Sequence, residues 1–76
     1  MKYKLKTILF KNGRKEYIAY KKRLIGWASV KWNGNTGDIF DISYTFDSRS
    51  AALHAIDLNF AGNTKVQDII IEIIVK

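Results

Sequence analysis

The stretch KTILFKNGRKEYIAYKKR, residues 6–23, decides which fold the chain can adopt. Apolar and charged residues alternate on both sides of Asn12-Gly13, and a period of two is typical of a β-strand with one buried face. Asn-Gly between two such segments is the strongest short-range signal for a β-hairpin, because a type I′ turn needs positive φ at both central residues. We therefore predict two antiparallel strands, at about 3–10 and 14–23, joined by a two-residue turn.

The length of this turn determines which side chains share a face. With a two-residue turn, one face of the hairpin covers the core, and it carries Tyr3, Leu5, Ile18, Tyr20 and Lys22. Lys4 then lies opposite Lys21 on the other face. A three-residue turn with a bulge would slip the register by one residue and pair Lys6 with Ile18. Because the slipped register mixes core and charged positions, the sequence favours the two-residue turn.

Charge is distributed unevenly along the chain. Residues 1–32 hold ten Lys or Arg and one acid, which gives +9, and residues 33–76 hold three Lys or Arg and six acids, which gives −3. Like charges directly opposite each other in a hairpin destabilise it by some tenths of a kcal/mol each. A polyanion bound on that face would turn the repulsion into attraction by releasing counterions. The pattern therefore predicts a partner with negative charge.

Aromatic rings lie among these basic residues, and Trp27 would extend the series. Basic residues interleaved with rings are typical of surfaces that bind single strands without reading their sequence. Two alternatives stay open: lysines that protect an edge hairpin from aggregation, and an acidic protein partner. With RNA favoured, the expected nucleic-acid-binding residues are Lys2, Lys4, Lys6, Lys15, Tyr17, Lys21 and Arg23.

The rest of the chain predicts further strands at about 27–32, 39–46 and 66–75. Between the last two, Asp47 or Ser48 is suited to cap a helix that runs to about Phe60, with Gly62 just beyond its end. We expect one α+β domain over residues 1–76, with elements in the order β-β-β-β-α-β. Its sheet would be mostly antiparallel, with about five strands and the helix packed on one face.

The last predicted strand carries apolar residues on both of its faces. It is therefore either a central strand covered on both sides or a surface for a partner, a second copy of the chain included. The predicted helix has a buried stripe of Leu53, Ile56 and Phe60, helped by Ala52, and Leu58 projects from nearly the opposite side. An alternative function is therefore a protein–protein inhibitor, whose expected partner interface is Leu58, Ile70 and Ile74.

Catalytic and metal chemistry find little support in the composition. The chain has no cysteine and one histidine, which is poor material for a zinc site. His54 and Asp57 are expected to form an exposed pair on the helix. No apolar run reaches the roughly 18 residues that a membrane span needs. We expect a non-enzymatic cytoplasmic protein without metal or cofactor.

Two longer segments carry a resemblance to a known group of proteins. The chain resembles the small basic accessory proteins of T4-like tailed phages in two segments. They are YKLKTILFKNGRKEYIAYKKRLIGW (3–27), and SRSAALHAIDLNFAGN (48–63) with the isoleucine-rich strand after it. The resemblance covers most of the chain. It implies a protein that acts on host machinery in the host cytoplasm. Some such proteins counter host defence systems, including RNA-cleaving toxins, by binding RNA or the toxin.

Overall fold

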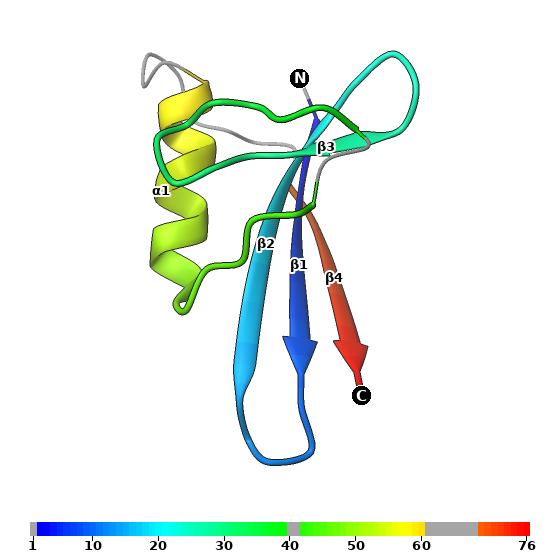
Figure 1. The fold of residues 1–76 in the computed structure, drawn as a ribbon, viewed down its shortest axis with the longest axis vertical. Coiled ribbons are helices and arrows are strands. Elements are labelled where there is room, and N and C mark those ends of the chain that lie inside the picture. Colours follow the sequence, from blue (N-terminus) through cyan, green and yellow to red (C-terminus); the bar gives the residue numbers. More distant parts are fainter. Residues whose placement is uncertain (1, 40–41, 61–68) are drawn as a thin grey trace.

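The computed structural model describes residues 2–39, 42–60 and 69–76, and it has an α+β fold. A mixed sheet has the strand order β3-β2-β1-β4, with α1 beside it (Figure 1). Two strand pairings, β1 with β2 and β2 with β3, are antiparallel, and β1 with β4 is parallel. The described residues thus form four strands where about five were predicted. The elements are β1 (Tyr3–Leu9), β2 (Lys15–Lys22), β3 (Trp27–Ser29), α1 (Arg49–Asn59) and β4 (Ile69–Val75).

The predicted register of the β1–β2 hairpin is wrong by one residue. Lys6 lies opposite Ile18, and the Phe10 amide donates to the Arg14 carbonyl at 2.9 Å as the last pair before the loop. The amide of Gly13 donates to the Phe10 carbonyl at 3.0 Å, and Gly13 has a φ of 87°. This geometry is that of a three-residue loop, in which a turn is followed by a left-handed residue that forms a bulge.

The loop sequence accommodates the three-residue alternative. Gly13 supplies the left-handed position that the bulge requires, and the Asn12 side chain accepts the amide of Arg14 at 3.0 Å. Because successive side chains of a strand point to opposite faces, the slip turns over every side chain of β2. Tyr17 and Ala19 therefore face the helix, and Ile18 and Tyr20 lie on the other side.

Small residues let the helix approach the sheet closely. The helix α1 packs on β2 and β1, and Ala19, Ala52 and Ala55 are all fully buried in the core. Tyr3 and Leu5 of β1 complete that core, as the alternation of β1 predicts. The helical stripe is also confirmed, because Ala52 and Ile56 are buried and Leu53 and Phe60 pack against the same cluster.

The start of the helix is also confirmed. Ser48 is the N-cap, and its hydroxyl accepts the amide of Ala51 at 3.2 Å. The helix ends at Asn59. The predicted C-terminal Gly62 lies outside the described residues.

Asn59 ties three segments together at the end of the helix. Its Oδ1 accepts the Tyr3 hydroxyl at 2.7 Å, which joins α1 to β1. Its Nδ2 donates to the Gly34 carbonyl at 2.9 Å and to Thr36 Oγ1 at 2.7 Å. This one amide holds the connection after β3 against the helix.

The predicted strand at 39–46 is not formed in its described part. Residues 42–45 lie in no strand, and Phe46 makes one isolated bridge with Tyr17. The reason is that β3 already pairs with Tyr20–Lys22, so β2 has little free edge left for another strand. The segment instead crosses the sheet on its way to α1 (Figure 1). Ile42, on the apolar face of that predicted strand, is 95% exposed, and residues 40 and 41 lie outside the described residues.

The strand predicted at 27–32 is also shorter than expected. It ends at Ser29 because the chain turns at Lys31, whose carbonyl accepts the Gly34 amide at 2.8 Å. Ala28 and Val30 are buried, whereas Trp32 is exposed.

We predict that Gly34→Ala destabilises the protein more than Gly26→Ala. Both glycines have positive φ, 83° and 73°, which costs alanine about 1–2 kcal/mol. A Cβ at Gly34 would also lie 2.6 Å from the Leu58 Cβ, whereas nothing lies within 4 Å at Gly26. Urea unfolding should therefore show a loss of about 2–5 kcal/mol for Gly34→Ala once the clash is added. Equal losses would mean that the helix does not press on Gly34.

The buried Tyr3 predicts how stability falls at alkaline pH. Burial raises the pKa of the Tyr3 phenol above its usual value of about 10. The neutral phenol is thus favoured in the folded chain, so its contribution is complete below pH ~10 and is lost as pH rises through the raised pKa. Urea unfolding from neutral to alkaline pH should show a smaller alkaline decline for Tyr3→Phe than for the unsubstituted chain. Tyr44→Phe, at an exposed position, is the control, and parallel declines for both variants would contradict the prediction.

Candidate nucleic-acid interface

The face of the sheet turned away from α1 carries a group of lysines and aromatic rings. We call it the open face. In the observed register Lys4 lies opposite Tyr20, and Lys22 lies opposite Trp27. The amide of Lys22 donates to the Lys2 carbonyl at 2.9 Å, which continues the same register. Near the start of β1, the basic and aromatic residues of the open face are Lys2, Lys4, Lys6, Tyr20, Lys22 and Trp27.

Lys4 lies at the centre of this group. Its Nζ is 4.6 Å from the centroid of the Trp27 ring and 5.6 Å from that of Tyr20. Lys22 Nζ lies 5.4 Å from the Trp27 centroid. Each contact is within the range of a cation–π interaction, which contributes about 0.5–1 kcal/mol at exposed sites. Neighbouring strands thus bring two rings and two ammonium groups into one cluster.

The only carboxylate that pairs with these lysines in the described part of the chain is Glu72 on β4. Its oxygens lie 3.7 Å from Lys4 Nζ and 4.0 Å from Lys6 Nζ. Partly exposed pairs at these distances contribute little to stability. They place the Glu72 carboxylate between the ammonium groups of Lys4 and Lys6 on the open face. Lys2 and Lys22 are more exposed and are without a salt bridge among the described residues.

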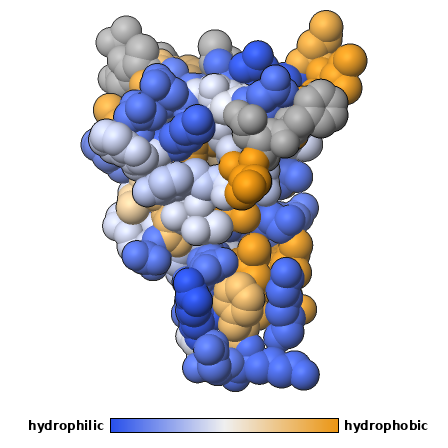
Figure 2. Space-filling view, in the orientation of Figure 1, coloured by the Kyte–Doolittle hydropathy of each residue, from blue (hydrophilic) through white to orange (hydrophobic). Residues whose placement is uncertain are grey.

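Apolar side chains fill the other end of the open face. Ile8 and Ile18 are buried there although they lie outside the core under the helix. The segment before α1 also contacts this face, with the Tyr20 hydroxyl 3.2 Å from Ser43 Oγ. Figure 2 shows hydrophobic side chains along β4, next to hydrophilic side chains of the hairpin. The basic and aromatic group around Lys4 thus lies at the end of the sheet near the start of β1. A separate pair lies at the hairpin loop, where the Arg14 guanidinium carbon is 5.9 Å from the centroid of the Phe10 ring.

The seven predicted binding residues do not share one face of the sheet. Lys2, Lys4 and Lys6 lie together on the open face, but Lys15, Tyr17 and Lys21 lie on the face that α1 partly covers. The expectation of one shared basic face is therefore wrong, and Lys4 and Lys21 are not a cross-strand pair. The cause is the hairpin register, because β1 keeps its predicted orientation and β2 is turned over.

The sequence reasoning missed Tyr20 and Lys22. Both were placed on the core face by the two-residue turn. The alternative register that pairs Lys6 with Ile18 would have put them beside Lys4 and Lys2. The three-residue loop that the sequence also allowed therefore predicts the observed positions of Tyr20 and Lys22. Trp27 was already named as an extension of the aromatic series.

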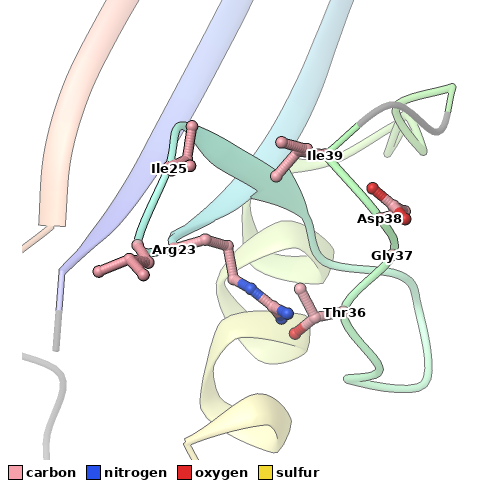
Figure 3. A pocket seen from close by; sticks show the side chains of 7 residues that line it. Arg23, Ile25, Thr36, Gly37, Asp38 and Ile39 are labelled. Carbon is pink, nitrogen blue, oxygen red and sulfur yellow. The ribbon is translucent and has the colours of Figure 1, made fainter.

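Arg23 lies at the turn between β2 and β3, beside a shallow open hollow of about 500 Å³. Its guanidinium group points toward Thr36 (Figure 3). Asp38, from the connection after β3, also lines the hollow. The hollow is open to solvent, and Arg23 is its one cation among the lining residues. They are Arg23, Leu24, Ile25, Thr36, Gly37, Asp38 and Ile39.

The predicted partner interface is not assembled into one surface. Leu58 and Ile70 are both about half exposed, and Ile74 is less exposed. Ile70 and Ile74 align with Lys4 and Ile8, so they share the open face. Leu58 lies on α1, on the other side of the sheet.

The described residues contain no group of three or more His, Cys, Asp or Glu side chains that could hold a metal ion. His54 and Asp57 are exposed on α1, as predicted. In the part of the chain that the structure describes, no helix is long and apolar enough to cross a membrane. Searches against protein-family models, curated proteins and solved structures find no match to this chain.

Proposed function

We propose that this protein binds single-stranded nucleic acid, RNA favoured, through the open face and without catalysis. The observation that carries the proposal is the position of Lys4 over the rings of Trp27 and Tyr20. Ammonium groups and aromatic rings on one surface match the phosphates and bases of a single strand. The proposed contact residues are Lys2, Lys4, Lys6, Tyr20, Lys22 and Trp27.

The charge of the open face supports the phosphate contacts. Lys2 and Lys22 are exposed, and they lie opposite each other at the end of the hairpin. These like charges repel in the free chain, and a phosphate between them would be attracted to both. Contacts of this kind fix the position of a strand without reading its sequence. We therefore propose binding with little base specificity.

The rings support the base contacts. Tyr20 and Trp27 lie on neighbouring strands, and sheet faces with such rings can stack two or more unpaired bases. In the free chain Lys4 Nζ occupies the space over both rings. A phosphate at the edge of the cluster would draw the ammonium group aside and leave a ring face for a base.

A single strand fits this surface better than a duplex. Stacking on a sheet requires bases that are not stacked on each other. Reading the major groove usually requires an exposed helix or a two-stranded ribbon that enters it. The helix α1 has no basic residue in its last turn, and it is packed against the sheet.

The resemblance to accessory proteins of T4-like phages supplies the proposed context. In that context the protein would be a counter-defence factor in the host cytoplasm. An acidic host protein that mimics nucleic acid would contact the same lysines. Measurements of nucleic-acid binding must therefore distinguish this alternative from binding of a single strand.

Lys22 and Lys21 provide a matched test of the phosphate contacts. They are adjacent in β2 and lie on opposite faces of the sheet, so replacing either by Gln removes the same charge. If about four cations contact phosphates, binding to oligouridylate should weaken with salt at a log–log slope of about −3. Lys22→Gln should flatten the slope by about 0.7, and Lys21→Gln should leave it nearly unchanged. A larger effect from Lys21→Gln would place the binding site on the helix side.

Trp27 tests the base contacts. Trp27→Leu should weaken oligouridylate binding by about 1–3 kcal/mol with little change in the salt slope, since stacking releases few ions. Trp32→Leu is the control, because Trp32 is exposed and lies beyond β3. Circular dichroism should show that both variants fold. Oligouridylate binding that depends on Lys22 but not on Trp27 would contradict base stacking, and no binding of oligouridylate at all would favour the acidic protein partner.

A further inference from the structure

The strand β4 forms an apolar edge of the sheet that no described strand covers. The helix α1 packs on β2 and β1 but does not reach β4. Ile71, Ile73 and Val75, on the helix side of the sheet, are therefore 49%, 61% and 77% exposed. Edge strands normally carry lysine, proline or a bulge that prevents pairing with another chain. Within Ile69–Val75 the single charge is Glu72, and there is no proline.

Alternate backbone groups of β4 are directed outward. The Lys76 amide donates to the Leu9 carbonyl at 2.9 Å, so Lys76 and every second residue before it face β1. By the same alternation, the amides and carbonyls of Ile71 and Ile73 point away from the sheet. They form a row of donors and acceptors to which a further strand can bond.

The sequence of β4 indicates which strand fits there. IIIEIIV reads almost the same in both directions about Glu72. In an antiparallel pair centred on Glu72, Ile71 meets Ile73 and Ile70 meets Ile74 of the other copy. A two-fold interface requires this reciprocity, in which residue i contacts j and j contacts i.

We propose that two copies of this chain pair through β4, antiparallel and about a two-fold axis at Glu72. Ile71 and Ile73 then form the hydrogen-bonded pairs, and the two Glu72 residues form a pair without hydrogen bonds, where side chains lie closest. Each Glu72 is already within 4.0 Å of Lys4 and Lys6 of its own chain, so four ammonium groups surround the two carboxylates. Their repulsion at the axis is thereby offset.

The assembly stops at two copies. The opposite edge of the sheet is β3, which is three residues long. The Gly37 amide donates to the Ser29 carbonyl at 2.9 Å, so part of that edge is already bonded. A two-fold pair at β4 thus uses the long free edge of each copy and leaves short, protected edges outside. The two open faces lie on the same side of the joined sheet, and this inference does not rest on nucleic-acid binding.

Sedimentation of the purified chain over a range of concentrations tests the assembly. An interface of one seven-residue strand is small, so we expect a dimer that dissociates on dilution. Ile73→Lys should raise the dissociation constant at least about tenfold, because it places a charge in the central pairs. Ile25→Lys is the matched control, since Ile25 is also exposed but lies at the β2–β3 turn. A monomer at every concentration would overturn the proposal.

The absence of cysteine from the chain allows a second test of the register. Glu72→Cys should form a disulfide-linked dimer on mild oxidation, because residues paired across the axis lie within the Cα separation of about 4.4–6.8 Å that a disulfide needs. Ile73→Cys should not link efficiently, since its partner is Ile71 of the other copy. Linkage through Ile73→Cys but not Glu72→Cys would overturn the axis at Glu72. This readout holds even where Ile73→Lys fails to fold.

Discussion

The three-residue loop at Lys11–Gly13 sets the constraint on which the rest of the structure depends. It fixes Leu9 opposite Lys15 and so determines which side of β2 meets the helix. In this register the small side chain of Ala19 lies under α1, where it allows the close approach of the helix. The same register brings Tyr20 beside Lys4 on the opposite face. The packing of the core and the composition of the open face therefore have one origin.

Local signals were enough to predict much of the fold. The alternation of β1 placed Tyr3 and Leu5 in the core, and Ser48 marked the start of the helix. Loop length was harder to predict, because Asn-Gly suits both a two-residue turn and a three-residue loop with Gly13 in the left-handed position. The choice depends on how Ala19 fits the alanines of α1, a contact between segments far apart in the sequence. Alternation at 39–46 was misleading for a similar reason, since β3 had taken the edge that a further strand would need.

In the candidate site too, local signals predicted some positions and contacts between distant segments decided the others. Lys2, Lys4 and Lys6 were predicted to share a face, and they do, because they depend only on the alternation of β1. The residues of β2 were assigned to the wrong faces, and the contact of Lys4 with Trp27 joins strands that are not neighbours in the sheet. Pairwise distances of this kind cannot be deduced from alternation within one strand. Of the six proposed contact residues, Lys2, Lys4, Lys6 and Trp27 were therefore named from the sequence, whereas Tyr20 and Lys22 follow from the hairpin register.

The parallel pairing of β1 with β4 has a consequence for the order of folding. Tyr3 aligns with Ile69 and Leu9 with Val75, so each pair is separated by 66 residues. Closing so large a loop costs chain entropy, and contacts of this range slow folding relative to local ones. The β1–β2 hairpin is local and can form early, whereas β4 must wait until the intervening chain is in place. Until β4 pairs, one edge of β1 lacks its partner, so we expect the strand at the middle of the finished sheet to be an edge strand early in folding.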